Sequence, residues 1–141
     1  MFVDLHIHSS YSDGTMTPDE IITAAKENKV KIISITDHNR VDAYKEPLKV
    51  VSDDLNLIVG TELDCTFSNR VWHVLGYGFD LSNSAMVSLI NSIKREQQHM
   101  SELLVQKMEK RYKEVSYDEY LSYSYIRSRG GWKGINYILD K

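Results

Sequence analysis

The stretch HIHSSYSDG, residues 6–14, places two histidines at the end of an apolar run and then enters a polar turn. Residues 2–7 read FVDLHI, which is typical of a buried strand in a parallel sheet. Side chains two residues apart on a strand point to the same face, so His6 and His8 should project side by side at its carboxyl end. From the following turn, Asp13 can fold back over them. Two imidazoles and a carboxylate that converge at a strand end form half of a metal site.

The composition is that of an ordinary globular protein. The 141 residues suit one domain, with 42% hydrophobic and 26% charged residues. The formal net charge of −3 argues against a surface that holds nucleic acid by bulk charge. No apolar run reaches the roughly 20 residues that span a bilayer, and no signal peptide precedes the first strand. Since the single cysteine, Cys65, also fits a reducing compartment, we expect a cytoplasmic protein with no membrane partner.

The first part of the chain alternates between strand and helix patterns. Thr17 is a predicted N-cap, with Pro18 at the first helical position and Glu20 closing a capping box. The expected elements are, in order, a helix from Pro18 to Asn28, a strand over residues 31–36, a helix from near Pro47, and a strand over residues 57–59 that runs on to Glu62. This order predicts an α/β fold with a parallel sheet.

The pattern changes after Glu62. Strand-like runs at residues 63–67 and 71–79 flank Ser68-Asn69-Arg70, which predicts a hairpin. Apolar residues at helical spacing then predict a long helix over residues 85–112, capped from Ser82-Asn83-Ser84. A second capping box, Ser116-Tyr117-Asp118-Glu119, and a last helix from Trp132 to Lys141 complete the expected elements.

Candidate ligands fall where the predicted strands end, which is where sites form in parallel α/β sheets. Taken singly, each has an ordinary explanation: Asp13 as a turn residue, His73 as a hydrogen-bonded surface histidine, and Glu62 with even odds of being a solvated loop residue. Their coincidence at one edge is harder to explain by chance. Imidazole and carboxylate together suit zinc, manganese or iron, with magnesium possible. His99 lies mid-helix and is expected to face solvent.

An ordered set of motifs resembles the PHP (polymerase and histidinol phosphatase) family: His6-Ile7-His8-Ser9 with Ser12-Asp13-Gly14, then Thr36-Asp37-His38, then Gly60-Thr61-Glu62, then His73 followed by Gly76-Tyr77-Gly78. The resemblance covers residues 1–80 closely and the long helix more loosely. It implies the N-terminal portion of a distorted (β/α)7 barrel, with a β-hairpin and a long helix. It also implies up to three divalent metal ions and the hydrolysis of phosphate esters.

The resemblance implies individual roles as well. The ligands that it implies are His6 and His8 for a first metal, His73 for a second, Asp13 and His38 for a third, and Glu62 as a bridge between the first and second. Asp37 is the expected catalytic residue, which orients a ligand or contacts a metal-coordinated water. Arg127 and Arg129 could clamp a substrate phosphate, although a solvated loop before a helix explains them somewhat better.

The chain departs from the family pattern after His73. The family's later ligands, a histidine in mid-barrel and an Asp-x-His near its end, have no counterpart, and a complete barrel takes about 250 residues. We therefore expect a single, truncated PHP-like domain over residues 1–141, divided into a metal-site half (1–80) and a helical extension (81–141). Its unpaired sheet edge and uncovered apolar face predict self-association.

Two functions follow. The first is a metal-dependent phosphoesterase that uses a metal-activated water on a small phosphorylated metabolite, a nucleotide or an oligonucleotide end. The second is a non-catalytic metal-binding or assembly module, in which a truncated barrel carries an incomplete site.

Overall fold

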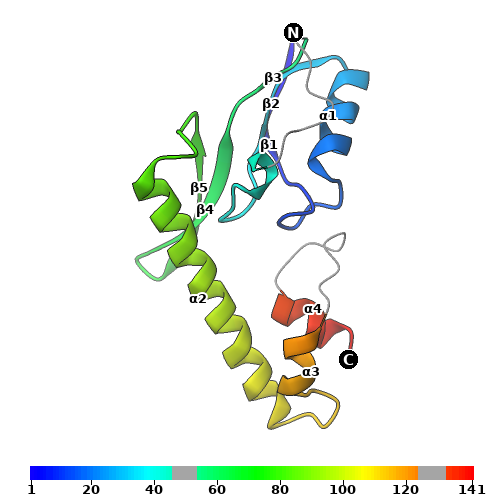
Figure 1. The fold of residues 1–141 in the computed structure, drawn as a ribbon, viewed down its shortest axis with the longest axis vertical. Coiled ribbons are helices and arrows are strands. Elements are labelled where there is room, and N and C mark those ends of the chain that lie inside the picture. Colours follow the sequence, from blue (N-terminus) through cyan, green and yellow to red (C-terminus); the bar gives the residue numbers. More distant parts are fainter. Residues whose placement is uncertain (46–53, 124–132) are drawn as a thin grey trace.

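The computed structural model describes residues 1–45, 54–123 and 133–141 of the chain. A part that contains the sheets and a smaller helical part are joined by a long helix (Figure 1). The N-terminus lies in the first part and the C-terminus in the second.

A parallel sheet forms the first part. Its strands β1 (Phe2–Ile7), β2 (Val30–Ile35) and β3 (Asn56–Leu57) lie in that order, and both pairings are parallel. Helix α1 (Pro18–Glu27) connects β1 to β2. Thr17 and Glu20 form the predicted capping box, and Asn28 is the C-cap. The α/β class and the parallel sheet are thus confirmed.

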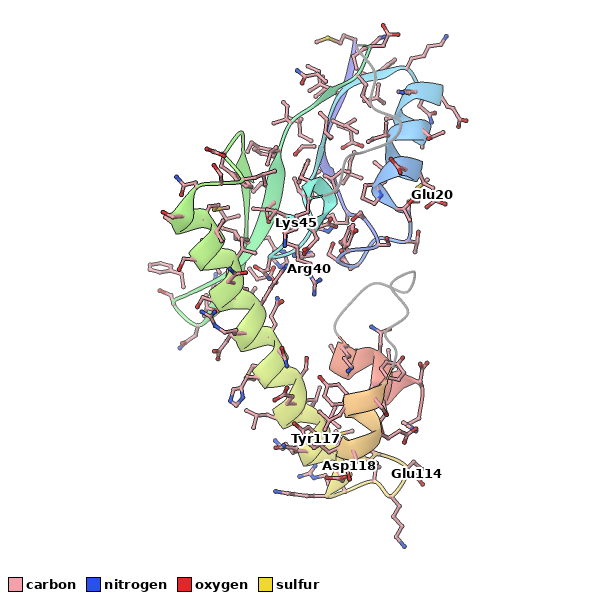
Figure 2. All side chains as sticks on the ribbon, in the orientation of Figure 1. Glu20, Arg40, Lys45, Glu114, Tyr117 and Asp118 are labelled. Atoms are coloured by element: carbon pink, nitrogen blue, oxygen red, sulfur yellow. The ribbon has the colours of Figure 1, made fainter. Side chains whose placement is uncertain are left out.

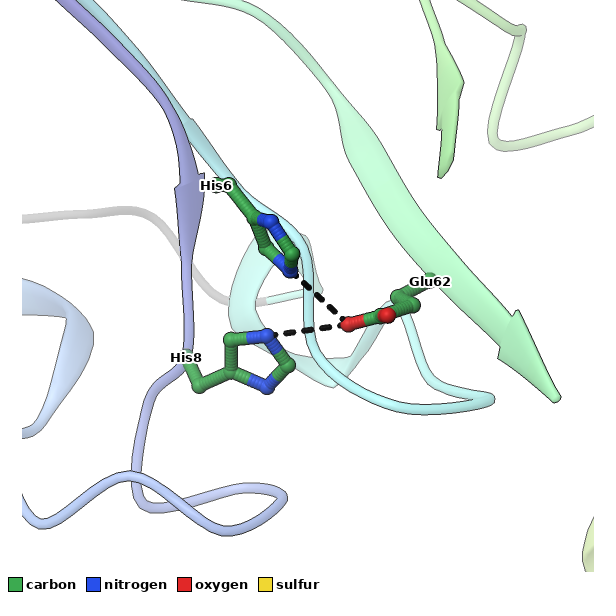
Figure 3. Close-up of side chains that lie close together, drawn as sticks. All are labelled: His6, His8 and Glu62. Carbon is green, nitrogen blue, oxygen red and sulfur yellow. Dashed lines mark hydrogen bonds and ion pairs between the residues drawn. The ribbon is translucent and has the colours of Figure 1, made fainter. Parts of the chain in front are cut away.

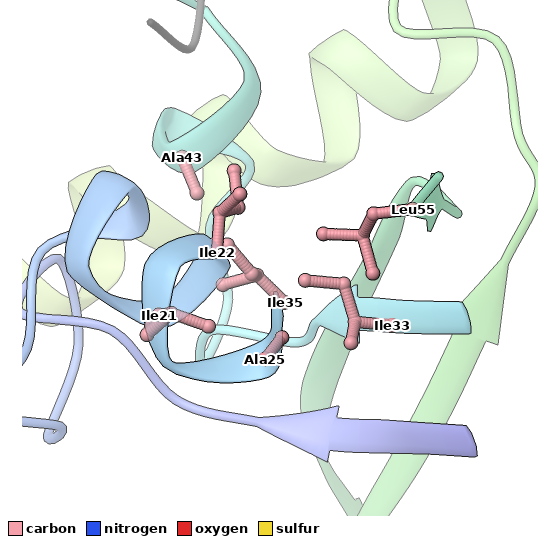
Figure 4. Close-up of a cluster of buried hydrophobic side chains, with 7 residues drawn as sticks. All are labelled: Ile21, Ile22, Ala25, Ile33, Ile35, Ala43 and Leu55. Atoms are coloured by element: carbon pink, nitrogen blue, oxygen red, sulfur yellow. The ribbon is translucent and has the colours of Figure 1, made fainter. Parts of the chain in front are cut away.

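The core of this part lies between α1 and β2. Seven side chains from α1, β2, the short 3-10 helix η1 (Asp42–Tyr44) and the approach to β3 make up the cluster, namely Ile21, Ile22, Ala25, Ile33, Ile35, Ala43 and Leu55 (Figure 4). Because α1 presents an apolar stripe at helical spacing, it can cover β2 and fix where that strand ends.

Two strand predictions were wrong. The first strand is not buried: β1 pairs with β2 alone, as an edge strand, and Phe2 and Val3 are exposed. The strand predicted over residues 57–59 does not run on to Glu62, since β3 ends at Leu57. The Tyr44 hydroxyl accepts hydrogen bonds from Ile35 N at 2.9 Å and Gly60 N at 3.1 Å. The Tyr44 hydroxyl therefore takes the place of strand-to-strand backbone hydrogen bonds between the end of β2 and Gly60.

The predicted hairpin is confirmed. Strands β4 (Gly60–Phe67) and β5 (Arg70–Tyr77) pair antiparallel around Ser68 and Asn69, which both have positive φ, at 49° and 59°. Two such residues form the tight turn whose twist matches that of the flanking strands. Glu62 lies in β4 and forms a parallel bridge with His38, which attaches the hairpin to the segment that leaves β2.

Helix α2 (Ser84–Glu109) begins at the predicted cap, Asn83, and leads to the helical part. There α3 (Tyr117–Ser122) and α4 (Lys133–Leu139) pack against its end through Val105, Val115, Tyr120 and Tyr137. Ser116 caps α3 as predicted, but its own N–H donates to the Tyr137 hydroxyl, not to Glu119. The last helix ends at Leu139, before Lys141.

Some predictions lie outside the described residues, among them the helix from near Pro47. Within the described ranges, no helix has both the length and the apolar character needed to cross a membrane.

Candidate metal centre

The first group of converging side chains joins β1 to β4. His6 and His8 present their Nε2 atoms to the same carboxylate oxygen, Glu62 Oε2, each at 3.0 Å (Figure 3). His6 lies on β1 and His8 just beyond its end, so the two-residue spacing lets both rings project to the same side, toward Glu62 on β4. The Glu62 side chain is almost fully buried, with 4% of its surface exposed.

A second group brings His73 and His38 to Glu62, and it involves both oxygens of the carboxylate. His73 on β5 places Nδ1 2.9 Å from Glu62 Oε1. His38, which follows β2, has Nε2 3.6 Å from Glu62 Oε2. Glu62 is therefore shared by two groups, one with His6 and His8 and one with His38 and His73.

A third group involves the turn after β1. Asp13 lies with Oδ1 2.7 Å from His8 Nδ1 and Oδ2 3.7 Å from His38 Nε2. The next residue, Gly14, passes so close to the strand end that a Cβ there would lie 2.0 Å from the His8 carbonyl oxygen. Only glycine fits this approach, so Gly14 allows the turn to bring Asp13 over the histidines.

The donor set fits divalent metal ions. In each of the three groups, the candidate ligand atoms lie within 4.8 Å of one another. His8 Nδ1 is buried and makes no hydrogen bond within the described ranges, although Asp13 Oδ1 is near it. A buried polar atom without a hydrogen bond is costly, and a cation held between His8 Nδ1 and Asp13 Oδ1 would give this nitrogen a partner. Imidazole with carboxylate is the donor chemistry of zinc, manganese and iron.

The surroundings of Glu62 and Asp13 favour the charged form of both carboxyl groups. Burial raises the pKa of Glu62, but the hydrogen bond from His6 and the charges on the neighbouring imidazoles outweigh it, so the pKa lies below its usual value. Burial likewise raises the pKa of Asp13, and the charges of His8 and His38 more than reverse this. Both carboxylates are thus poised to be negatively charged ligands.

Asp37 is buried behind this edge and holds the turn after β1. Its Oδ1 accepts hydrogen bonds from Ser9 N at 2.7 Å and Ser12 Oγ at 2.6 Å, and its Oδ2 accepts from Ser9 Oγ at 2.7 Å. The side chain is 1% exposed. Asp37 therefore fixes the loop that carries Asp13.

The sequence analysis missed Asp64. This residue lies on β4 two positions after Glu62, and its Oδ1 is 2.9 Å from His38 Nδ1 while its Oδ2 accepts from Asn39 Nδ2 at 2.7 Å. The signal was present, because residues two apart on a strand share a face. It was overlooked because Glu62 was assigned to the end of a strand that the structure ends earlier.

A cavity of about 620 Å³ adjoins the candidate ligands. Asp13, His38 and His73 line one side, and Gln97 and Met100 of α2 line another. Arg40 also lines it and projects from the segment after β2 (Figure 2).

Two predictions remain, one for Arg127 and Arg129 and one for His99. Arg127 and Arg129 fall outside the described residues, so their phosphate role stays a prediction. His99 is exposed on α2, as predicted.

Comparison with known proteins places this geometry in context. A family model described as the PHP domain matches residues 4–134. The chain is 31% identical over 110 residues to the 5'-3' exoribonuclease Rnm of Salmonella typhimurium, and 28% identical over 93 residues to the 3',5'-nucleoside bisphosphate phosphatase of Chromobacterium violaceum. These alignments cover 76% and 65% of this chain. The chain spans 38% and 33% of the length of these two relatives.

Two solved structures share the fold. An amidohydrolase from Chromobacterium violaceum, with sulfate bound and no metal, has a TM-score of 0.75 at 20% identity, covering 99% of this chain and 50% of its own. A protein from Bifidobacterium adolescentis, assigned as a metal-dependent phosphoesterase, has a TM-score of 0.74 at 22% identity, covering 93% and 46%.

Proposed function

The chain belongs to the PHP domain family, and from this premise we propose that it is a phosphoesterase that hydrolyses phosphate esters with the help of bound divalent ions. The observation that carries the proposal is Glu62, a nearly buried carboxylate that faces two histidine groups at once, beside a cavity large enough for a small ligand. A carboxylate in this position can hold two ions together.

The finer fold and the ligand roles belong to the same proposal. We infer that the described sheet is the N-terminal portion of a distorted (β/α)7 barrel, with residues 1–80 as the metal-site half and residues 81–141 as a helical extension. The proposed ligands are His6, His8 and Glu62 for a first ion, Glu62 and His73 for a second, and Asp13 and His38 for a third. Ions held there would lower the pKa of a coordinated water and neutralise charge on the phosphate oxygens.

Other residues near the proposed ions would orient a ligand or contact the substrate. Asp37 holds the turn that carries Asp13, so it acts on the reaction by orienting that ligand. The Arg40 guanidinium can pair with a phosphate oxygen that enters the cavity, because a planar guanidinium matches that geometry. Gln97 and Met100 of α2 also line the cavity, so they are placed to contact a bound substrate.

The proposed substrate is a nucleotide or the end of an oligonucleotide. The two relatives, an exoribonuclease and a nucleoside bisphosphate phosphatase, support this class over other phosphate esters. The preferred ion stays open among zinc, manganese, iron and magnesium.

The sharing of ligands separates this proposal from a purely structural metal module. Three of the six candidate ligands, His8, His38 and Glu62, each belong to two of the three groups. Structural zinc sites are closed by four ligands of their own, whereas hydrolytic sites can hold neighbouring ions with a position open to substrate. The shared groups beside the cavity therefore favour chemistry over a closed structural site.

The test is a phosphate-release assay on the purified chain after dialysis into zinc, manganese, iron or magnesium. Substrates would be p-nitrophenyl phosphate, a nucleoside 3',5'-bisphosphate and a 5'-phosphorylated oligoribonucleotide, with Glu62→Gln as the matched inactive variant. We expect metal-stimulated release from the nucleotide substrates by the wild-type chain. Tight metal binding without release under any metal would support the non-catalytic module instead.

A further inference from the structure

Asp64 makes contacts that the proposed metal ligands do not account for. Its Oδ1 is 2.9 Å from His38 Nδ1 and 3.6 Å from His73 Nδ1, so the contact with His38 is the closer of the two. The opposite ring atom, Nε2, is the one that lies 3.6 Å from Glu62 and 3.7 Å from Asp13. Asp64 thus contacts Nδ1 of His38, while Nε2 of the same ring faces Glu62 and Asp13.

The second oxygen of Asp64 is held in place by Asn39. Asn39 Nδ2 donates to Asp64 Oδ2 at 2.7 Å, and Asp64 N donates back to Asn39 Oδ1 at 3.0 Å. Asn39 is 1% exposed and has a φ of 54°, a conformation that asparagine adopts more readily than most residues. With Oδ2 held by this reciprocal pair, Oδ1 faces His38 Nδ1 and can accept a hydrogen bond from its N–H.

We propose that Asp64 is a positioning residue that keeps the His38 proton on Nδ1, so that the Nε2 lone pair faces the metal site. A carboxylate oxygen accepts hydrogen bonds, so the His38 nitrogen beside it is the one that carries the proton. Histidine ligands in metal sites commonly donate their other N–H to a carboxylate, which fixes the tautomer and ring orientation. The inference rests on the proposed metal site, but the tautomer itself is a property of the metal-free chain.

The first experiment measures the tautomer without metal. Long-range ¹H–¹⁵N spectra of the histidine side chains report which ring nitrogen is protonated, and a His38→Gln variant assigns the His38 signals. In the wild-type chain we expect the Nδ1–H form to dominate. Asp64→Ala should lose that preference. Asp64→Asn should lose part of it, because keeping the amide oxygen toward His38 would turn the amide NH₂ toward the NH₂ of Asn39, which is also a donor.

Two variants separate this role from a general structural one. Asn39→Gly removes the side-chain pair that fixes Oδ2 but tolerates the positive φ and leaves the Asp64 carboxylate in place, so it should weaken the preference for the Nδ1–H form less than Asp64→Ala does. Glu114→Gln removes one negative charge from an exposed residue beyond the far end of α2 and should change nothing (Figure 2).

The second experiment is a Zn²⁺ titration of the same variants, followed by calorimetry. Asp64→Ala should weaken zinc binding at the His38 group by about 10- to 100-fold with unchanged stoichiometry, and Glu114→Gln should bind like the wild-type chain. An unchanged His38 tautomer in Asp64→Ala would overturn the proposal. Loss of a whole equivalent of zinc in Asp64→Asn would overturn it as well, by making Asp64 a direct ligand. If the wild-type chain binds no zinc, the proposed metal site fails, while the tautomer still decides the role of Asp64.

Discussion

At the scale of single residues, the site depends on a carboxylate that faces histidines from three separate segments. Glu62 Oε2 lies 3.0 Å from both His6 and His8, and Oε1 lies 2.9 Å from His73. Asp13, in contrast, belongs to one group only. The two carboxylates can therefore be compared directly, since each is a negative ligand but only Glu62 is shared.

We predict that Glu62→Gln loses metal from two groups together. The amide keeps the shape of the side chain but removes the charge that holds cations. Asp13→Asn should reduce only the metal of its own group. Elemental analysis of the dialysed proteins measures both stoichiometries, and an unchanged metal content in Glu62→Gln would refute the bridging role.

The second residue-scale prediction concerns Asp37. Replacing it with alanine removes the acceptor of three hydrogen bonds inside the protein, from Ser9 N, Ser9 Oγ and Ser12 Oγ. Buried donors left without partners should lower the free energy of unfolding by about 3 kcal/mol. Asp54→Ala, at an exposed position, is the control and should stay near wild-type stability. Urea unfolding measures both variants, and equal midpoints would contradict the role assigned to Asp37.

The parts of the site that depend on short stretches of sequence were predicted better than those that depend on contacts between distant segments. The spacing of His6 and His8 and the turn at Asp13 are local patterns, and the structure brings these residues together with His38, Glu62 and His73 as expected. Asp64 was missed because the sequence patterns assign it and Glu62 to two different strands, and its partners, His38 and Asn39, are 26 and 25 residues away in the chain. Contacts of this kind depend on how β4 attaches beside β2, which no local pattern specifies.

At the scale of elements, caps and turns were predictable and strand ends were not. The Thr17 capping box, the Asn83 cap and the Ser68-Asn69 turn each depend on neighbouring residues, and all three are present. The end of β3 depends on the Tyr44 hydroxyl, which bonds to backbone groups of β2 and of Gly60. The apolar residues of α2 follow a helical period, yet Met100 and Leu103 are exposed. Periodicity predicts which side of a helix is apolar, but it does not predict which element packs against that side.

The element-scale prediction concerns how α2 is tied to the first part of the molecule. Lys94 on α2 donates to Asp42 Oδ2 of η1 at 2.6 Å, and Lys45 donates to Oδ1 at 2.9 Å. Burial raises the pKa of Asp42, but these two lysines outweigh it, so the pKa falls below the ordinary 3.8. Because the pKa of Asp42 is lower in the folded state than in the unfolded state, its ion pairs stabilise the protein fully when the pH is above the ordinary pKa of 3.8. That stabilisation is lost as the pH falls through the lowered pKa.

A double-mutant cycle with Lys94→Met and Asp42→Asn should therefore give a coupling free energy of about 1 kcal/mol at pH 7. The coupling should vanish once Asp42 is protonated at acid pH. Lys45→Met serves as the matched variant. Lys45 is only three residues from Asp42, so its ion pair is local and does not connect η1 to α2. Its substitution should leave the hydrogen-exchange protection of α2 unchanged, whereas Lys94→Met should reduce it. A coupling that persists at pH 2 would rule out this account.

At the scale of the whole molecule, apolar side chains remain exposed on the sheets. On the hairpin, Trp72 and Val74 lie on the face opposite Glu62, and both are about half exposed, at 51% and 48%. Phe67 at the turn and Phe2 on the edge strand β1 are more exposed still. Exposed edges and contiguous apolar patches are common sites of association between chains.

We predict that the chain self-associates through this hairpin face. Covering a half-exposed Trp72 or Val74 contributes about 1 kcal/mol each, so the association should be reversible and depend on concentration. The double variant Trp72→Gln, Val74→Thr should shift the population toward monomer, because it keeps strand-compatible side chains and removes the apolar surface. Val87→Gln on α2, at another exposed apolar position, controls for a general gain in solubility. Light scattering over a range of concentrations measures the mass of all three proteins. A monodisperse wild-type monomer at every concentration would show that these exposed faces do not pair with one another.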